Sequence, residues 1–363
     1  MTRRVYLHVG APKTGTTYLQ DRLALNRQEL GRHDVHYPLG LRADHFKAAL
    51  DLLDIEWDGQ RESARGEWAR LVDRVNRHDG SVIVSHEILA GARPEQIRQA
   101  MEDFEGSEIH LVYGARDLAR QIPSEWQEGV KHRRRRSFAR FLREVQRAGR
   151  TRPTMWFWRA QGVPDVLTRW GHGLPPEQIH LVTVPQAGAP RDQLWLRYCD
   201  AFGFDPAWAP LESTRENVSI GTAETALLRR LNRRLRKAGL SGDDYRRLIR
   251  QIVVHDTLAH RPDMTRATLP PRAFGWAEEV AQEWIDWVEG SGVRVHGDVD
   301  DLRPVRPPED SVWLNPDRPR RREMVDAALD ALVALTLEAA HRPDPEEQLT
   351  AKLGRAARRL RGQ

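Results

Sequence analysis

The stretch that most constrains this 363-residue chain is an apolar strand followed by a short glycine-containing loop and a threonine-rich helix start. The strand covers residues 5–9, the loop covers 10–15, and the helix begins with Thr16 and Thr17. In such an arrangement the backbone N–H groups of the loop and of the first helical turn surround an anion. The beginning of the chain therefore predicts a phosphate-binding loop within an α/β fold.

The loop differs from the nucleoside-triphosphatase pattern G-x-x-x-x-G-K-[ST] in the position of its lysine. Gly10 and Gly15 are in register and Thr17 follows, but Thr16 stands where that pattern has lysine. The lysine of this loop is Lys13, so its ammonium group would approach an anion from the loop side. An ordinary tight strand-to-helix turn is the alternative interpretation.

The loop sequence resembles the 5′-phosphosulfate loop of sulfotransferases that use PAPS (3′-phosphoadenosine-5′-phosphosulfate) as the sulfuryl donor. The matching residues are Pro12, Lys13, Thr14, Gly15, Thr16 and Thr17. The resemblance is strongest to bacterial sulfotransferases of unassigned acceptor. It implies a P-loop-type fold, a donor site without a metal ion, and binding of the 5′-phosphate by these residues. It also implies that Lys13 stabilises the negative charge that develops on the leaving phosphate.

A second motif follows the apolar strand at residues 109–113. Arg116 stands at the end of this strand, and Ser124 follows eight residues later. A guanidinium group matches the geometry of phosphate, and a serine hydroxyl adds a further donor. In the sulfotransferases that the loop resembles, an Arg and a Ser at this spacing bind the 3′-phosphate, so the resemblance assigns that role to Arg116 and Ser124. The alternative is a surface turn in which Arg116 pairs with Asp117.

Two neighbouring residues, His86 and Glu87, are the candidates for the base that removes the proton from the acceptor. They follow the strand at 82–84, and ligands of open α/β sheets bind at the carboxyl ends of strands. Small-molecule sulfotransferases use a His near this place and glycan-modifying ones use a Glu, so the resemblance does not choose; we favour Glu87. Because side chains alternate along a strand, we expect the two side chains to point apart. His8, on the first strand, is a third candidate.

Alternation of apolar strands and amphipathic helices predicts a three-layer α/β fold, in which a central parallel sheet has helices on both faces. The expected strands cover residues 5–9, 35–37, 82–84, 109–113, 179–184 and 293–298. We divide the chain into a PAPS-binding α/β core (1–210), a helical C-terminal part packed on that core (211–340) and a basic amphipathic tail (341–363). The tail is either a terminal helix or a contact for an anionic membrane or an acidic partner.

The composition agrees with a cytoplasmic enzyme that binds an anionic donor. The chain has 57 Lys and Arg against 52 Asp and Glu, a formal net charge of +5. Its one cysteine excludes an internal disulfide and fits a reducing compartment. No apolar run approaches the roughly 18–20 residues that a membrane span needs, and no signal peptide precedes the first strand. We therefore expect a cytoplasmic protein without a transmembrane segment.

Three other segments bear on the acceptor and the donor. The basic run at 131–136 is a solvated helix end, a rim for an acidic or sulfated acceptor, or, with least support, a contact for nucleic acid. The aromatic residues Trp156, Phe157 and Trp158 either line an acceptor pocket or pack in the core. The loop 215–219 is the local candidate for a segment that closes over the 3′-phosphate, as the resemblance implies.

Together these features predict a PAPS-dependent sulfotransferase acting on a hydroxyl or amine of a small molecule, glycan or lipid. PAPS is the expected co-substrate, with no metal ion and no nucleic-acid partner. A P-loop kinase or other NTPase is one alternative; the G-K-[ST] sequence is absent, although Glu87 could mimic its acidic residue. A nucleotide-binding homologue without activity is the other, and the intact Lys13, Arg116 and Ser124 argue against it.

Overall fold

The computed structural model describes residues 3–38, 45–213 and 219–342 of the chain. By their internal contacts the residues form two compact units: unit 1 (1–217 and 267–318) and unit 2 (218–266 and 319–363). The three-part division expected from the sequence stays a prediction.

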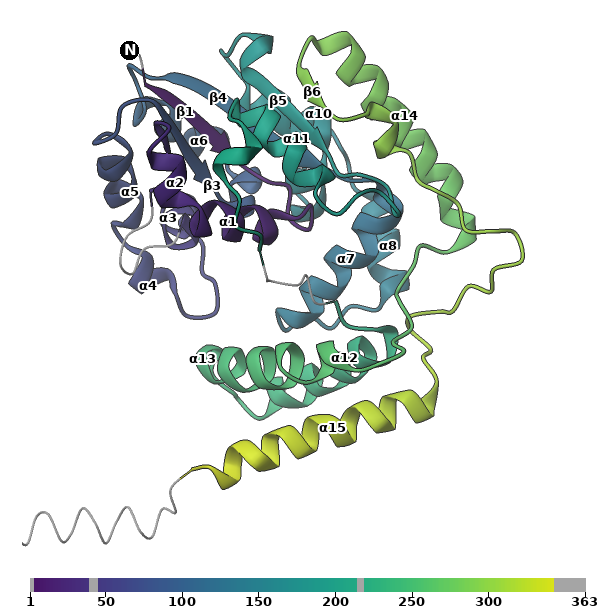
Figure 1. Cartoon of the computed structure of the whole chain (residues 1–363). Helices are drawn as coiled ribbons and strands as arrows, with labels where there is room; N and C mark the ends of the chain where they lie inside the picture. The colour runs from purple at the N-terminus through teal and green to yellow at the C-terminus, as the bar shows by residue number, and fades with distance from the viewer. Residues whose placement is uncertain (1–2, 39–44, 214–218, 343–363) are drawn as a thin grey trace, which may run out of the picture. The chain divides into compact units, whose positions relative to one another are not determined.

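Six parallel strands form the central sheet of unit 1. They are β1 (Arg4–His8), β2 (Val35–His36), β3 (Ser81–Ser85), β4 (Glu108–Ala115), β5 (Ile179–Thr183) and β6 (Arg294–His296). Their order across the sheet is β2-β3-β1-β4-β5-β6 (Figure 1). The parallel sheet predicted from the sequence is confirmed.

Helices cover both faces of this sheet. In unit 1 they are α1 (Thr16–Leu25), α2 (Arg27–Gly31), α3 (His45–Leu53), α4 (Arg61–Ala64), α5 (Glu67–Val75), α6 (Pro94–Glu102), α7 (Leu118–Lys131), α8 (Phe138–Arg147), α9 (Trp156–Gln161), α10 (Val163–Trp170), α11 (Gln193–Phe202) and α14 (Phe274–Ser291). On one face, Tyr198 of α11 belongs to a buried apolar cluster with Tyr6 and Val112 of the sheet. On the other, the Tyr113 hydroxyl donates to the carbonyl of Ala160 in α9 at 2.9 Å. The three-layer arrangement is therefore confirmed as well.

The strand order creates a switch point between β1 and β4, which are neighbours near the centre of the sheet. From β1 the chain continues to β2 and β3 on one side, and from β4 it continues to β5 and β6 on the other. In open α/β sheets, ligands bind outside the carboxyl ends of the strands at such a point. The loop after β1 and Arg116 after β4 therefore meet at the edge of the sheet where a ligand is expected.

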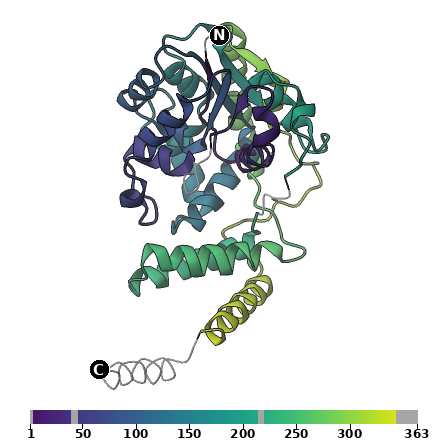
Figure 2. The same cartoon turned by 60° about the vertical axis from the view of Figure 1, so that its left-hand side comes forward.

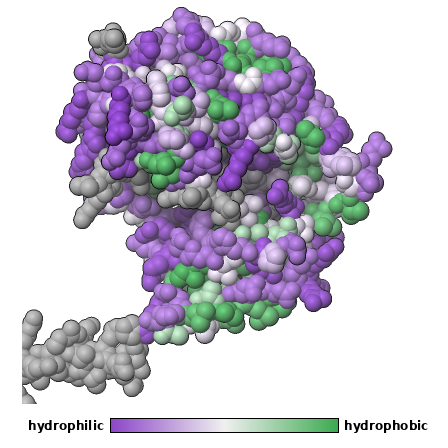
Figure 3. All heavy atoms as spheres, in the orientation of Figure 1, coloured by the Kyte–Doolittle hydropathy of each residue, from purple (hydrophilic) through white to green (hydrophobic). Residues whose placement is uncertain are grey.

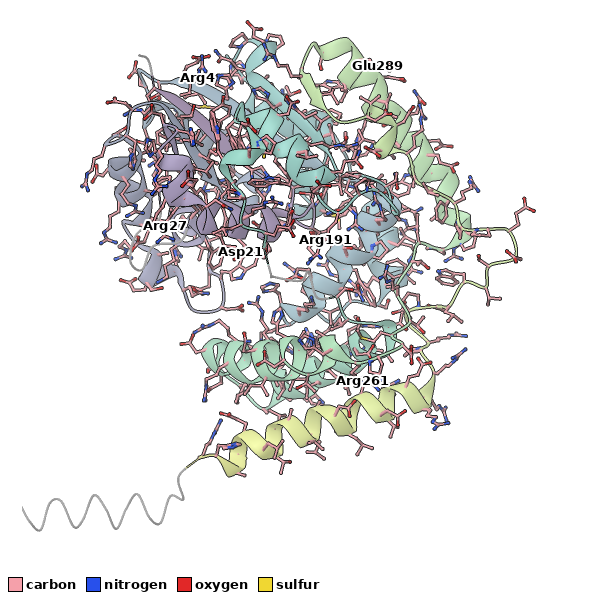
Figure 4. The ribbon with its side chains drawn as sticks, in the orientation of Figure 1. Arg4, Asp21, Arg27, Arg191, Arg261 and Glu289 are labelled. Carbon is pink, nitrogen blue, oxygen red and sulfur yellow. The ribbon has the colours of Figure 1, made fainter. Side chains whose placement is uncertain are left out.

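Unit 2 is helical, and its described elements are α12 (Thr222–Lys237), α13 (Gly242–Asp244), the π-helix η4 (Tyr245–His255), the 3-10 helix η5 (Leu258–His260) and α15 (Arg321–Ala340). Figure 2 shows α12 in green and α15 in yellow as its long helices. The exposed face of α15 is apolar (Figure 3), through Val325, Leu329, Leu332, Val333 and Leu337. Arg261 links the two helices, because its guanidinium group pairs with Glu224 of α12 and, at 2.7 Å, with Asp330 of α15 (Figure 4). Within the described part of the chain, no helix combines the length and apolar character needed to cross a membrane.

Gly114 of β4 lets the loop after β1 pass close to the sheet. Its N–H donates to the carbonyl of Gly10 at 2.6 Å, and the Ala11 N–H donates to the carbonyl of Gly114 at 2.9 Å. A Cβ at position 114 would overlap the Tyr198 hydroxyl and lie 3.0 Å from Oγ1 of Thr14. Glycine is required here because the Tyr198 and Thr14 side chains leave no room for a Cβ.

We expect Gly114→Ala to lower the free energy of unfolding by about 1–3 kcal/mol, the usual cost of overpacking a filled site. Gly149→Ala is the matched control, because no atom lies within 4 Å of a Cβ built there. Chemical denaturation followed by circular dichroism measures both variants. Equal stability of the two would show that the loop yields to the added methyl group.

Candidate active site

The loop after β1 is held in shape by its own hydrogen bonds and by two distant glutamines. Oγ1 of Thr14 donates to the carbonyl of Ala11 at 2.6 Å. Nε2 of Gln121 in α7 and Nε2 of Gln161 in α9 donate to the carbonyl of Pro12, at 2.6 and 3.0 Å. Both glutamines are buried. The protein therefore orders the loop through α7 and α9, a contribution that the sequence did not reveal.

The first turn of α1 presents backbone N–H groups that the helix itself cannot satisfy. Gly15 is the N-cap with a φ of 90°, and the described first turn has neither a capping side chain nor an acidic residue. Thr16 is buried and Thr17 is exposed. Lys13 has a φ of 66°, which is uncommon for a residue with a side chain. The partial positive charge of this helix end suits an anion.

Arg116 and Ser124 lie beside this loop. Nη1 of Arg116 is 3.4 Å from the carbonyl oxygen of Lys13 and 3.5 Å from Oγ of Ser124. Asp117, the partner in the surface-turn alternative, caps α7 by accepting from the Arg120 N–H at 3.0 Å and also binds the Arg120 guanidinium group. The structure thus brings together the loop lysine, the arginine and the serine that the sequence singled out.

The Lys13 ammonium group pairs with a carboxylate of α7. Its Nζ lies 2.9 Å from Oε2 of Glu128. Burial alone would lower the pKa of Lys13, but the charge and hydrogen bond of Glu128, together with the charges of Glu125 and Glu87, outweigh burial and raise it. Burial would raise the pKa of Glu128, but the charge of Lys13 and a hydrogen bond from His132 hold it well below its ordinary value. Both groups are therefore charged at neutral pH.

A further acidic side chain, Glu125, lies in the same region and was missed in the sequence. Burial raises its pKa to about 7, with Lys13 opposing and Glu128 adding to the shift. Nε2 of Gln161 donates to its Oε1 at 3.3 Å. Gln121, Glu125 and Glu128 recur at i, i+4 and i+7 of α7, which places them on one helix face. That polar spacing is the signal that could have identified Glu125.

His86 and Glu87 lie just beyond the end of a strand. β3 stops at Ser85, and His86 is the N-cap of the 3-10 helix η1 (Glu87–Gly91). Its Nδ1 accepts a hydrogen bond from the Ile88 N–H at 3.3 Å, and its Nε2 is 3.8 Å from Oε2 of Glu87. The expectation that the two side chains point apart was wrong, because strand alternation ends at Ser85.

Glu87 is positioned by α1, whereas His8 is a core residue. Nε2 of Gln20 donates to Oε2 of Glu87 at 3.1 Å. Burial would raise the pKa of Glu87, but the charge of His86, hydrogen bonds and other nearby groups hold it below its ordinary value. His8 is fully buried, its Nδ1 lies 2.7 Å from Oγ of Ser85, and burial lowers its pKa to about 4. A neutral, buried His8 cannot contact an acceptor.

The basic run at 131–136 starts inside unit 1. Lys131 is buried, and its Nζ lies 3.5 Å from Oε2 of Glu128. Nε2 of His132 lies 3.3 Å from Oε1 of the same glutamate. The interpretation of this run as a wholly solvated helix end is therefore wrong for Lys131 and His132, because both side chains contact Glu128.

The aromatic segment at 156–158 supplies core residues. Phe157 and Trp158 are 2% and 1% exposed, and Nε1 of Trp158 donates to the carbonyl of Val145 at 2.8 Å. Of the two interpretations, packing in the core is therefore the correct one for Phe157 and Trp158. Most of the loop expected over the 3′-phosphate (215–219) and of the basic tail (341–363) lies outside the described residues.

Glu125 gives stability a definite pH dependence, because its pKa rises from 4.5 unfolded to about 7 folded. Between pH 4.5 and about 7 the Glu125 carboxyl has lost its proton in the unfolded chain but keeps it in the folded chain. The free energy of unfolding therefore falls as the pH rises through this range. We expect Glu125→Gln to raise the free energy of unfolding at pH 8 by at most about 3 kcal/mol and to change it little at pH 4. Urea unfolding measures this, with the exposed Glu105→Gln as control. Equal stabilisation at both pH values would contradict the assigned protonation.

No protein-family model and no curated protein matches the sequence. Among solved structures, the chain is similar to one described as a sulfotransferase from Alicyclobacillus acidocaldarius. The two share 16% sequence identity, the similarity covers 60% of this chain and 87% of that chain, and the TM-score is 0.37.

Proposed function

We propose that the chain is a sulfotransferase that moves a sulfuryl group from PAPS to a hydroxyl or amine. One observation carries the proposal: two cationic motifs meet at the switch point of the sheet. Arg116 lies 3.4 Å from the backbone of Lys13, although 103 positions separate them in the sequence. PAPS carries phosphate groups at both its 3′ and 5′ positions, so two adjacent cationic sites suit this donor.

The loop and the start of α1 suit the 5′-phosphosulfate end of the donor. We assign the contacts to Pro12, Lys13, Thr14, Gly15, Thr16 and Thr17. The uncapped first turn offers N–H groups, and Lys13 adds a full positive charge. The Thr14 hydroxyl already donates to the carbonyl of Ala11, so its part is to shape the loop.

Arg116 and Ser124 suit the 3′-phosphate. The planar guanidinium fork of arginine matches two phosphate oxygens. Oγ of Ser124 lies 3.5 Å from Nη1 of Arg116, so one phosphate oxygen could contact both groups. The Ser124 hydroxyl also donates to the carbonyl of Arg120 at 2.8 Å. Binding at both ends would hold the donor in one orientation for transfer.

In the reaction, the acceptor oxygen or nitrogen forms a bond to sulfur while the bond from sulfur to the bridging phosphate oxygen breaks. The electron pair of that bond leaves with 3′-phosphoadenosine-5′-phosphate, and the acceptor proton passes to a base. Lys13 would stabilise the charge that accumulates on the leaving phosphate. This assignment requires no metal ion.

We assign the base to Glu87, with His86 as the alternative. The Glu87 side chain is 24% exposed, so an acceptor can reach it. Its lowered pKa keeps it ionised and able to take a proton at neutral pH. Gln20 fixes the carboxylate from α1, the helix that begins at the donor loop. The acceptor class stays a small molecule, a glycan or a lipid, and the expected compartment is the cytoplasm.

The spent donor, 3′-phosphoadenosine-5′-phosphate, should raise the thermal midpoint of unfolding by about 2–4 °C at a hundredfold excess over its Kd, because a ligand of the native state stabilises by mass action. AMP lacks the 3′-phosphate and should raise it much less, as should ATP with Mg²⁺. Differential scanning fluorimetry compares the three nucleotides. A larger rise with ATP and Mg²⁺ would replace the proposal with a P-loop kinase.

Arg116→Ala tests whether the two phosphate sites are separate. Loss of a charge-assisted hydrogen bond costs about 1.5–3 kcal/mol, so the variant should bind the 3′-phosphorylated nucleotide roughly ten- to a hundredfold more weakly and bind AMP as before. The exposed Arg98→Ala on α6 is the matched control. Calorimetry measures both affinities, and an equal loss for both nucleotides would assign Arg116 a structural role.

Glu87→Gln keeps the size of the side chain but cannot take a proton at neutral pH. General base catalysis contributes about 10²–10⁴-fold, so turnover should fall by that order while nucleotide affinity stays the same. His86→Asn should cost much less. A phenol or sugar acceptor with labelled PAPS gives the turnover. Loss of activity in His86→Asn with activity spared in Glu87→Gln would make the histidine the base.

A further inference from the structure

Three histidines form a hydrogen-bonded row across β4, β5 and β6. His110, His180 and His296 are each at most 8% exposed. Nδ1 of His110 lies 2.9 Å from Nε2 of His180, and Nδ1 of His180 lies 2.9 Å from Nε2 of His296. Oε1 of Glu108 lies 3.0 Å from Nε2 of His110, and Oδ2 of Asp200 in α11 lies 2.5 Å from Nδ1 of His296. A carboxylate therefore closes each end of the row.

The row lies outside the candidate active site. His110 and His180 are near the amino-terminal ends of their strands, whereas Arg116 follows the carboxyl end of β4. A cavity of about 450 Å³ borders the row. The charged groups that face it are Arg4 of β1 (Figure 4), Glu108 of β4, Glu177 of the 3-10 helix η2 (Pro176–Gln178), Arg294 of β6 and Asp200 of α11. The ring of Tyr6 stacks on His110 at 4.8 Å between centroids. An inference about this row does not depend on the proposed reaction.

Proton counting shows that the row needs more protons than three neutral imidazoles supply. Each of its four contacts needs one proton between the two heavy atoms. A neutral imidazole has one N–H and a carboxylate has none, so three neutral histidines supply three protons. Without a fourth, two lone pairs would face each other at 3.0 Å or less in one contact. Each contact includes a ring nitrogen of a buried histidine, and leaving a buried acceptor unpaired is costly.

The fourth proton belongs at the Asp200 end of the row. Burial lowers the pKa of His110, and burial with the charges of His296 and His110 lowers the pKa of His180 to about 3. The hydrogen bond from His110 is the largest cause of a lowered pKa at Glu108. His110 and His180 are therefore neutral and Glu108 is ionised. The 2.5 Å contact between His296 and Asp200 is the remaining place for the proton.

We propose that His296 is an imidazolium ion in the folded chain and that its extra proton fastens β6 and α11 to the centre of the sheet. His296 then donates from Nδ1 to Asp200 and from Nε2 to His180. His180 donates to His110, and His110 donates to Glu108, so each contact has one donor and one acceptor. β6 is an edge strand of three residues that pairs with β5. Loss of the proton breaks the row at one contact, which makes the attachment of β6 sensitive to pH.

The sign of the pH effect follows from counting protons in the two states. Unfolded histidines are neutral above their ordinary pKa of about 6.5, whereas the folded chain keeps one proton on His296. The folded chain then binds one proton more than the unfolded chain, so its stability falls as pH rises. For one proton, the unfolding equilibrium constant rises at most about tenfold per pH unit.

Nuclear magnetic resonance of the full-length chain with ¹³C-labelled histidine tests the charge directly. The Cε1–H signal of each ring moves on protonation. At pH 7.5 we expect His296 at its protonated position and His110 and His180 at neutral positions, with the exposed His172 as a solvent-facing comparison. Comparison with His296→Gln and His180→Gln assigns the signals. A neutral His296 at pH 7.5 would overturn the proposal.

Asp200→Asn gives a second test at a surface position, because this side chain is 75% exposed and its replacement should not prevent folding. The amide fits beside the ring but lacks the charge that retains the proton. We expect the Cε1–H signal of His296 at pH 7.5 to move towards its neutral position. Between pH 7 and 9 the unfolding equilibrium constant of the variant should rise less steeply with pH than that of the natural sequence, by a factor of up to about ten per pH unit. Asp192→Asn, an exposed acid at the N-cap of α11, is the charge-matched control. Identical pH profiles of the two variants would contradict the proposal.

Discussion

The candidate site depends on one close approach between two backbones, at Gly114. The loop after β1 is joined to β4 by the hydrogen bonds from Gly114 to Gly10 and from Ala11 to Gly114, at 2.6 and 2.9 Å. Arg116 follows Gly114 by two residues, so the contact that shapes the loop also sets the distance between Arg116 and Lys13. Attraction between side chains could not do this, because the two cations repel each other. The backbone therefore provides the spacing, and an anion could use the charge that results.

α7 provides the counter-charge for the cations of the candidate site, and it also anchors the loop after β1. Its first turn is capped by Asp117, and Ser124 on the same helix reaches Arg116. One turn after Ser124, Glu128 pairs with Lys13 at 2.9 Å. One turn before it, Gln121 anchors the loop at the carbonyl of Pro12. A single helix thus carries a phosphate-binding hydroxyl in the proposed function, a counter-charge and a structural anchor. Its position after β4 is set by the strand order.

The central strands β1, β3, β4 and β5 were predictable because their signals are local: each contains an apolar run. Arg116 and Ser124 belong to the strand–helix unit that starts with β4. The geometry of His86 and Glu87 was not predictable, because it depends on β3 ending at Ser85. Hydrophobicity does not mark that end. The bond from Gln161 to Pro12 joins residues 149 positions apart, and no spacing rule reports such a contact. The buried Lys131 was missed for a related reason, because its partner Glu128 counts as a surface acid until the fold is known.

The ion pair between Lys13 and Glu128 explains how a donor anion could enter without leaving a charge unpaired. The two side chains are 34% and 27% exposed, so neither gives up all contact with water while they are paired. If Lys13 turns to a bound phosphosulfate, Glu128 keeps Lys131 at 3.5 Å and His132 at 3.3 Å. Breaking a buried pair is costly mainly because one charge is left alone, and neither partner is left alone here. The same exchange in reverse would return Lys13 to Glu128 when the nucleotide leaves. The acidic face of α7 is therefore compatible with the proposed anion site, because Glu128 would hold the lysine until an anion replaced it.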